Sequence, residues 1–292
     1  MFIPYAESQT IITHTEGLVK FLEKSLSQKL LQQESGFYIK SSIPTSYVAV
    51  VESFGTGRAD VAAMTTFSYL LTKDVKKYPV EAFLTVDRYP DGLKYRGAII
   101  ARADSKVKSV EDLKGKKFAY ADPASTSGFI LPAKLFKDKG IELAETMFAG
   151  RHDTVVMMVY QKQVDAGAIY YSSPEQRREN GKTTFHIRDA RSMTLTQIPD
   201  VEKQIQIVGF TEEVPNEPWV IRTTIYQNPE EQERLKKALT ESIIEFTSSP
   251  DGKNLMQVLV RAEKVVPVTD AFYDPVRDIL KTLNLDTEKL VK

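Results

Sequence analysis

The sequence predicts an α/β protein built on open sheets, and three observations support this prediction. Apolar residues alternate between strand-like and helical spacing along the 292-residue chain. The composition, with 42% hydrophobic and 27% charged residues, is that of an ordinary folded protein. At about 100 to 200 residues per domain, the length corresponds to two domains or one large one.

The predicted elements follow in chain order. We expect strands over residues 2–5, 37–40 and 117–121, and helices over residues 15–29, 109–115, 229–246 and 274–283. Ser109 can cap the start of the short element at 109–115, and Gly115 supplies its left-handed stop. Three glutamates in the first turn of the 229–246 helix complement its dipole.

The charge balance and the absence of cysteine exclude several function classes. Lys plus Arg and Asp plus Glu both number 39, so no basic surplus exists to neutralise nucleic-acid phosphates. Without cysteine there is no disulfide, thiolate nucleophile or Cys-ligated metal. The histidines, His14, His152 and His186, lie too far apart for a local metal motif, so we expect neither metal nor cofactor. No hydrolase-type triad order, nucleophile elbow or Walker loop occurs, so we expect no enzyme.

Two segments of the chain, residues 47–64 and 152–169, correspond position by position. The spacing from Tyr47 to Asp60 equals that from His152 to Asp165, and both segments predict a helix, a tight turn and a buried strand. Two lobes of like construction would each offer a helix start and a strand end, where open α/β sheets bind ligands. A chance likeness between two ordinary helix-turn-strand units is the alternative.

The run Asp122-Pro-Ala-Ser-Thr-Ser-Gly128 is the leading candidate site. A helix that starts here would bring free backbone N–H groups, three hydroxyls and its positive dipole end to one point, which suits an oxyanion. Gly128 allows close backbone approach, and Pro132 must lie in a first turn or at a kink. The alternative is that Ser125 only caps the helix. His152 lies beside Arg151 at the start of the second repeated helix. Its role could be either structural or in ligand binding.

Four segments together resemble the phosphate/phosphite/phosphonate-binding proteins of bacterial ABC transporters, nearly end to end. They are residues 122–132, 109–116, 150–153 with 164–168, and 268–276. The resemblance implies a two-lobed, type II periplasmic-binding-protein fold, in which each lobe is a mixed sheet flanked by helices and two crossover strands form the hinge. We expect lobe I to comprise residues 1–99 and 212–292, and lobe II residues 100–211.

The resemblance also implies a function. The protein would capture a small phosphorus oxyanion, first a phosphonate and otherwise phosphite or phosphate, in the cleft between the lobes, and deliver it to a membrane permease. We expect a monomer that is periplasmic or anchored outside the cytoplasm, with its signal segment missing, because the start at Met1 lacks export features. The alternatives are a sensor or binding domain for another oxyanion, such as a sulfonate, and an enzyme on the same fold.

The resemblance further implies ligand-binding positions, which are Tyr47, Thr66, Tyr95, Ser125, Thr126, Ser127, Gly128, His152, Tyr170 and Glu217. In relatives that bind aminoalkylphosphonates, an acidic residue in a Pro-Asn-Asp-Pro segment meets the ligand amine, and Pro215-Asn-Glu-Pro218 here offers Glu217. The second acidic position of such relatives falls near Ser172, which is not acidic. Glu217 therefore either reads an amine or simply faces solvent.

Overall fold

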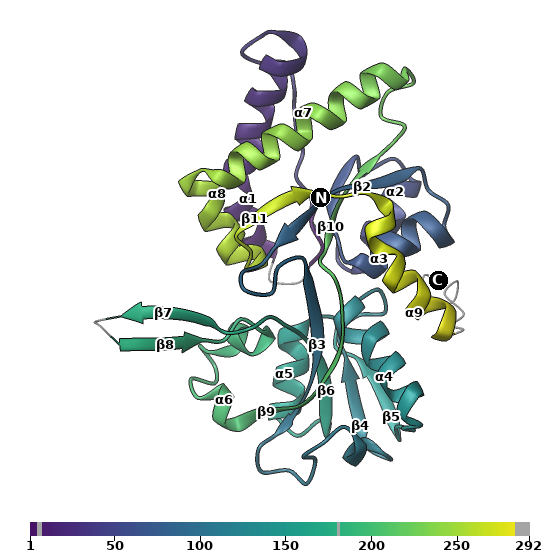
Figure 1. Cartoon of the computed structure of the whole chain (residues 1–292), viewed down its shortest axis with the longest axis vertical. Helices are drawn as coiled ribbons and strands as arrows, with labels where there is room; N and C mark the ends of the chain where they lie inside the picture. The colour runs from purple at the N-terminus through teal and green to yellow at the C-terminus, as the bar shows by residue number, and fades with distance from the viewer. Residues whose placement is uncertain (5–7, 180–181, 284–292) are drawn as a thin grey trace. The chain divides into compact units, whose positions relative to one another are not determined.

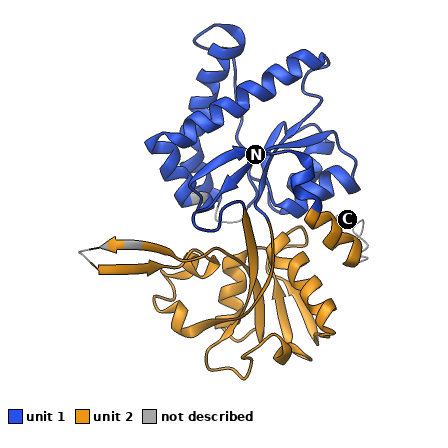
Figure 2. Cartoon of the chain, in the orientation of Figure 1, with its two compact units in different colours: residues 1–93, 215–274 blue, residues 94–214, 275–292 orange. Residues whose placement is uncertain are grey.

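The chain divides into two compact units in the computed structural model, which describes residues 1–4, 8–179 and 182–283 (Figures 1 and 2). Unit 1 comprises residues 1–93 and 215–274, and unit 2 comprises residues 94–214 and 275–292. Each unit has its own sheet and its own hydrophobic core. The expected α/β organisation is therefore present in both units.

Unit 1 is built on a four-stranded sheet. In spatial order its strands are β1 (Val61–Ala63), β10 (Pro218–Arg222), β2 (Val80–Asp87) and β11 (Lys264–Pro267). These strands pair antiparallel, and a parallel bridge joins Phe2 to Ala63. The central strand β2 is buried at six of its eight positions, as expected for a strand whose two faces are both covered.

Two long helices, α1 (Ser8–Leu26) and α7 (Pro229–Ser248), pack on this sheet and share its core. A hydrogen bond of 2.8 Å joins the hydroxyls of Ser25 and Ser242 where the helices meet. Asn228 caps α7 by accepting the N–H of Glu230 at 2.9 Å, which explains why this helix begins where the sequence predicts. The other helices of unit 1 are α2 (Tyr47–Gly55), α3 (Thr66–Leu70) and α8 (Pro250–Leu255).

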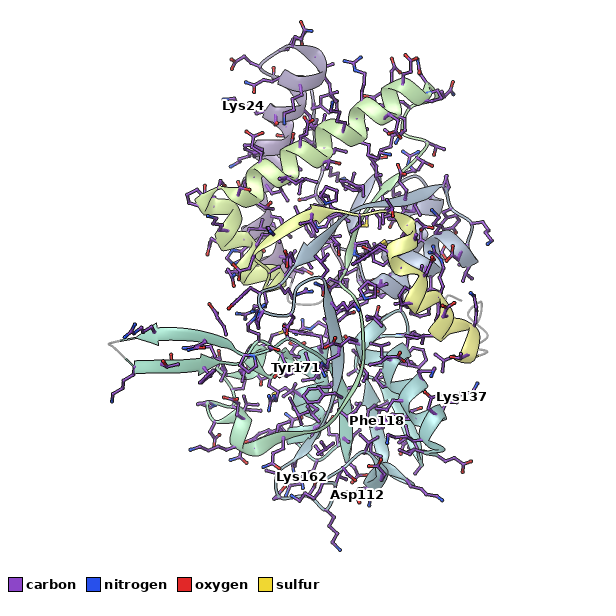
Figure 3. The ribbon with its side chains drawn as sticks, in the orientation of Figure 1. Lys24, Asp112, Phe118, Lys137, Lys162 and Tyr171 are labelled. Atoms are coloured by element: carbon purple, nitrogen blue, oxygen red, sulfur yellow. The ribbon has the colours of Figure 1, made fainter. Side chains whose placement is uncertain are left out.

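Unit 2 is built on a five-stranded mixed sheet. Its order is β5 (Glu145–Phe148), β4 (Lys117–Tyr120), β6 (Ala166–Tyr171), β3 (Lys94–Arg102) and β9 (Ile205–Pro215). Strand β4 runs parallel to β5 and β6, whereas β3 runs antiparallel to β6. Figure 3 shows Phe118 and Tyr171 within this unit and Asp112 and Lys162 at its edge. Unit 2 also contains helices α4 (Leu131–Lys139), α5 (His152–Tyr160), α6 (Val201–Gln204) and α9 (Asp274–Leu283), and the hairpin β7 (Glu175–Glu179) to β8 (Lys182–His186).

The two segments that correspond in sequence, residues 47–64 and 152–169, also have similar structures. Helices α2 and α5 are both nine residues long, and each leads through a turn into a strand. The matched turn residues Gly57 and Lys162 are both left-handed, with φ of 68° and 64°. The two units therefore contain the same helix-turn-strand motif, each with a helix start at its head.

Three local predictions need correction. Of the strand expected at residues 2–5, only Phe2 pairs, in an isolated bridge to Ala63, and residue 5 lies outside the described residues. Residues 37–40 form no strand, because the N–H groups of Phe37 and Ile39 donate to the side chains of Ser27 and Glu23 at 3.0 and 2.8 Å. The element at 109–115 is a short 3₁₀ turn, Glu111–Leu113, and Gly115 ends it in the left-handed region as expected. Ser109 does not cap it, because the residue before the turn is Val110 and no side chain caps the start. The Asp112 carboxylate instead accepts the N–H groups of residues 108 and 109, both at 2.9 Å.

Candidate functional site

The Asp122–Gly128 turn joins β4 to a helix in unit 2. The helix starts with one π turn, Thr126–Ile130, and continues as α4 to Lys139. Ser125 is its N-cap, because Ser125 Oγ accepts the N–H of Gly128 at 3.0 Å. Pro132 is the second residue of α4 and directly follows the π turn, so it lies where the regular hydrogen-bond pattern of the helix is interrupted. The capping role considered for Ser125 is thus present, and it does not preclude binding.

Ser127 lies two residues after the Ser125 cap, in the first turn of this helix. The residue is 3% exposed, yet its hydroxyl makes no hydrogen bond to any residue within 1–4, 8–179 and 182–283. A hydroxyl that makes no such bond is free to donate to a bound ligand. Ser127 also lies in the first turn of a helix, where the dipole favours negative charge. An anion at this turn would satisfy both features.

His152 is the first residue of α5 and is 4% exposed. Its Nδ1 accepts the backbone N–H of Tyr170 on β6 at 3.2 Å, and the two rings pack edge to face with centroids 5.1 Å apart. Burial lowers the pKa of His152 from 6.5 to about 4, an effect that the charge of Asp153 opposes. The ring is therefore neutral at pH 7, with its proton on Nε2, which lies 3.4 Å from Ser125 Oγ.

This geometry provides hydrogen-bond donors and lacks a general base. In a hydrolase, the histidine nitrogen facing the serine must accept the hydroxyl proton while the other nitrogen donates to an orienting group. Here the other nitrogen accepts a backbone N–H, so the nitrogen that faces Ser125 already carries the proton. The Ser125–His152 pair is suited to binding an oxyanion and not to activating a nucleophile.

Two glycines bring these groups together. A Cβ on Gly128 would lie 2.5 Å from Ala121 Cβ, 2.8 Å from Ser125 Oγ and 2.9 Å from His152 Cε1, so only glycine fits at this point. On β3, a Cβ on Gly97 would lie 2.8 Å from the carbonyl oxygen of Ser127. Sequence reasoning did not identify Gly97, although an isolated glycine in a strand often marks a close backbone approach.

The donors in this part of unit 2 are neutral. Arg151 stands next to His152, but its Nε donates to Asp153 Oδ1 at 3.0 Å within the same turn. The remaining groups are hydroxyls, an imidazole N–H and backbone N–H groups at a helix start. Such a set binds an oxyanion through hydrogen bonds and the helix dipole. Tyr170 borders it through its contact with His152, whereas Tyr95 lies on β3 at 5% exposure.

The predicted residues of unit 1 lie at two helix starts. Tyr47 is the first residue of α2 and is 1% exposed, directly after the Ser46 cap. Thr66 is the first residue of α3 and is fully buried. Its hydroxyl donates to the carbonyl oxygens of Pro215 and Asn216 at 3.1 and 3.3 Å. The Thr66 side chain is thus engaged within the fold of unit 1.

Glu217 does not simply face solvent, as one alternative proposed, because it forms an ion pair. Arg88 Nη1 lies 2.8 Å from Glu217 Oε2, with side-chain exposures of 7% for Arg88 and 26% for Glu217. Arg88 also donates to Asn216 Oδ1 at 2.8 Å and to the carbonyl oxygen of Val260 at 2.9 Å. Arg88 was not identified from the sequence. Ser172, near the second acidic position of the amine-binding relatives, is 4% exposed at the end of β6.

The described part of the chain holds no group of three or more His, Cys, Asp or Glu side chains that could bind a metal ion. It also holds no helix that is long and apolar enough to cross a membrane.

Comparison with known proteins gives a family match over most of the chain. The family described as "ABC transporter, phosphonate, periplasmic substrate-binding protein" matches residues 1–273. The phosphate-import protein PhnD of Mycolicibacterium smegmatis is 26% identical over 294 residues, covering 95% of this chain and 83% of that protein. The phosphonates-binding periplasmic protein of Escherichia coli is 21% identical over 238 residues, covering 78% of this chain and 62% of that protein.

Solved structures show the same fold. A binding-protein component of an ABC phosphonate transporter from Pseudomonas aeruginosa aligns with a TM-score of 0.76 and 18% identity, covering 100% of this chain and 87% of that one. PhnD1 of Prochlorococcus marinus, in complex with methylphosphonate, aligns with a TM-score of 0.72 and 18% identity, covering 97% and 96%. The periplasmic aliphatic sulphonate binding protein SsuA of Escherichia coli aligns at 0.63 with 14% identity, covering 100% and 93%. The predicted type II periplasmic-binding-protein fold is confirmed.

Proposed function

Since the chain belongs to the periplasmic substrate-binding proteins of phosphonate ABC transporters, we propose that the Ser125–Gly128 turn and His152 hold the oxyanion of its ligand. The protein is the substrate-binding component of a phosphonate or phosphate importer, and its family binds solutes without catalysing a reaction. Its ligand is of the phosphonate type, and an importer component implies a permease partner. The predicted function and periplasmic location are confirmed, and the enzyme alternative is excluded by the family.

The observation that carries the proposed site is the unpartnered hydroxyl of Ser127 beside the Ser125–His152 pair. Both serine hydroxyls and the protonated Nε2 of His152 are neutral donors at the start of a helix. Each hydrogen bond to a charged oxygen contributes roughly 1.5 to 3 kcal/mol, so a few such bonds suffice for tight binding without a positively charged side chain.

We also propose that the ligand carries no amine. The Glu217 carboxylate, which would have to attract an ammonium, is already paired with a buried guanidinium at 2.8 Å. Arg88 is fixed by Asn216 and Val260 as well, so an ammonium at Glu217 would lie beside a fixed positive charge. Ser172 offers no second carboxylate. Methylphosphonate, phosphite and phosphate fit this arrangement better than 2-aminoethylphosphonate.

Isothermal titration calorimetry tests both parts of this proposal. The ligands are methylphosphonate, phosphite, phosphate, 2-aminoethylphosphonate and methanesulfonate, the last for the sulfonate alternative. We expect a phosphorus oxyanion to bind most tightly, and Glu217→Gln to change the affinities for methylphosphonate and 2-aminoethylphosphonate equally. The exposed neighbour Glu212→Gln is the matched control. Preferential binding of 2-aminoethylphosphonate that only Glu217→Gln abolishes would contradict the amine-free ligand, and preferential binding of methanesulfonate would contradict the ligand class.

The proposal extends to the other predicted positions. Tyr47→Phe and Tyr95→Phe should each weaken methylphosphonate binding and leave the fold intact. Thr66→Ala should mainly lower the free energy of unfolding, because the Thr66 hydroxyl donates to two backbone carbonyls. We further propose that the protein works as a monomer without nucleic acid, which size-exclusion chromatography coupled to light scattering and an absorbance spectrum would check.

A further inference from the structure

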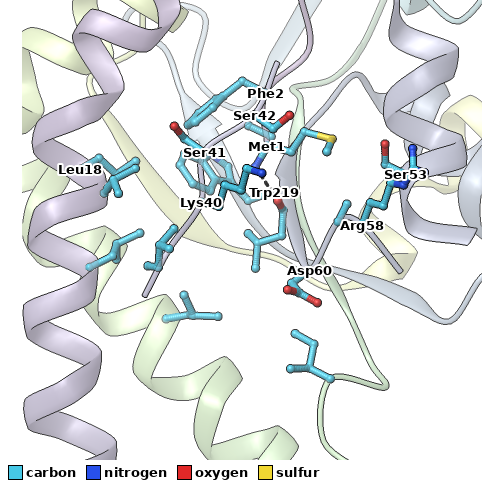
Figure 4. Close-up of a pocket in the computed structure, with 18 of the residues that line it drawn as sticks. Met1, Phe2, Leu18, Lys40, Ser41, Ser42, Ser53, Arg58, Asp60 and Trp219 are labelled. Carbon is cyan, nitrogen blue, oxygen red and sulfur yellow. Dashed lines mark hydrogen bonds between the residues drawn. The ribbon is translucent and has the colours of Figure 1, made fainter. Parts of the chain in front are cut away.

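Unit 1 contains a cavity of about 1040 Å³ that the proposed oxyanion site does not use (Figure 4). Small-molecule pockets span roughly 300 to 1,000 Å³, so this cavity is large enough for a ligand of moderate size. Residues of α1, α2, β1, β10 and α7 line it, together with the segment 37–45. None of the ten predicted ligand-binding residues lines it.

The interior of this cavity is apolar. Its walls include seven core side chains, each at most 7% exposed, which are Leu18, Leu22, Leu26, Trp219, Leu235, Leu239 and Ile243. They all belong to the hydrophobic core of unit 1. A hydrocarbon chain placed against them would leave water for an apolar surface, whereas a polar group there would lose hydration without gaining a partner.

The exposed part of the lining carries two positively charged side chains. The side chains of Lys40 and Arg58 are exposed, and neither forms a hydrogen bond or an ion pair with any residue that the structure describes. The acidic groups of the lining are neutralised, since Asp60 pairs with Arg222 and Glu52 pairs with Lys76. Figure 4 shows Lys40, Arg58 and Asp60 around the cavity. The surplus positive charge complements an anionic head group.

The segment that covers part of the cavity has no sheet partners. Residues 32–46 are irregular, which is longer than the median connection of about 4 to 6 residues in compact domains. The segment is held where the N–H groups of Phe37 and Ile39 donate to the side chains of Ser27 and Glu23. The backbone N–H of Phe2 also donates to the carbonyl oxygen of Ser42 at 3.2 Å, farther along the segment. A ligand could enter beside Phe37 and Ile39 by displacing the two side-chain bonds, with no strand removed from the sheet.

We propose that this cavity binds a single-chain amphiphile with an anionic head, namely a medium-chain fatty acid. The hydrocarbon chain lies among the leucines of α1 and α7, and the carboxylate lies near Lys40 and Arg58. Each buried methylene strengthens binding about fourfold, the equivalent of roughly 0.8 kcal/mol. Affinity therefore depends on chain length and on the sign of the head-group charge.

Titration calorimetry with dodecanoate below its critical micelle concentration tests this proposal on the full chain. We expect saturable binding of one dodecanoate, about fifteenfold weaker binding of decanoate, and at least tenfold weaker binding of dodecyltrimethylammonium. The double variant Lys40→Glu/Arg58→Glu should weaken dodecanoate binding at least tenfold. Lys106→Glu/Lys114→Glu, which reverses two exposed charges of unit 2, is the matched control and should bind as the wild type does.

A second variant tests the apolar part of the cavity. Ala49→Phe, at a half-buried position of α2 in the lining, should fill part of the cavity. The chain length beyond which an added methylene no longer strengthens fatty-acid binding should therefore be shorter in this variant than in the wild type. Ala49→Phe and Lys40→Glu/Arg58→Glu should both keep the wild-type affinity for methylphosphonate, because none of the residues proposed to bind the oxyanion lines this cavity. Unsaturable dodecanoate binding, equal binding of the cationic amphiphile, or wild-type dodecanoate affinity in Lys40→Glu/Arg58→Glu would each overturn the proposal.

Discussion

Replacing Ser127 by alanine separates ligand binding from helix capping at the oxyanion turn. The Ser127 hydroxyl makes no hydrogen bond within the described part of the chain, whereas Ser125 Oγ accepts the N–H of Gly128 at 3.0 Å. Removal of the Ser127 hydroxyl therefore takes no hydrogen bond from the free protein. In the complex, the same substitution removes one donor to a charged oxygen.

The two serine substitutions have different expected magnitudes. A hydrogen bond to a charged group contributes roughly 1.5 to 3 kcal/mol, so Ser127→Ala should weaken methylphosphonate binding about 10- to 150-fold. Its free energy of unfolding should stay within about 0.5 kcal/mol of the wild type. Ser125→Ala should also weaken binding, but it removes an N-cap and should lower the free energy of unfolding by about 0.5 to 2 kcal/mol.

Two measurements on each variant decide the matter. Titration calorimetry with methylphosphonate gives the dissociation constant, and urea denaturation without ligand gives the free energy of unfolding. Wild-type affinity in Ser127→Ala would refute the assignment of this hydroxyl to the ligand. A loss of stability in Ser127→Ala as large as that in Ser125→Ala would show that the Ser127 hydroxyl has a structural partner after all.

Two further predictions concern Gly97 and His152. Gly97→Ala places a Cβ 2.8 Å from the backbone oxygen of Ser127, so it should displace the turn and weaken methylphosphonate binding at least tenfold by calorimetry. Gly17→Ala, whose Cβ would meet only Phe246 Cζ at 3.8 Å, is its control and should bind normally. Burial lowers the pKa of His152 from 6.5 to about 4. Between pH 6.5 and pH 4 the unfolded state therefore binds more protons than the folded state. The free energy of unfolding falls with pH across this range, by about 3 kcal/mol in total. Urea denaturation at pH 7 and pH 4.5 should show a loss that is about 2 to 3 kcal/mol larger in the wild type than in His152→Asn, since the carboxylates titrate in both proteins; equal losses would contradict it.

The parts of the fold that were predictable are those whose signals are local. The helix at 274–283 was predicted with the bounds that the structure has, and the 229–246 prediction lies within α7. Amphipathic spacing, an N-cap and a first-turn proline all lie within one or two turns of chain. The strand predicted at 37–40 was wrong because alternating apolar residues record burial on one side and do not identify the partner of the backbone. Here Phe37 and Ile39 pack against the core, while their N–H groups bind side chains of the first helical region.

In the candidate site too, the residues that were predictable from the sequence are those with a local signal. The Asp122–Gly128 turn was visible because a strand, hydroxyls, a glycine and a helix follow one another within a few residues. Arg88 was not visible, since its acceptors on Asn216, Glu217 and Val260 lie more than 120 positions away in the sequence. Gly97 was missed for the same reason, because its close neighbour is the backbone of Ser127 on another element.

Charge patterns could not have revealed the proposed oxyanion turn, because no unpaired cationic side chain of the described residues lies in it. The one arginine beside it is paired with Asp153, and the histidine that faces it is held neutral by burial and by the N–H of Tyr170. Recognition must then rest on the placement of donors, which Gly97 and Gly128 permit by allowing close backbone approach. A protein that captures an anion and later releases it to a permease is well served by this arrangement, since neutral donors can be matched to the ligand and exchanged with water at little electrostatic cost.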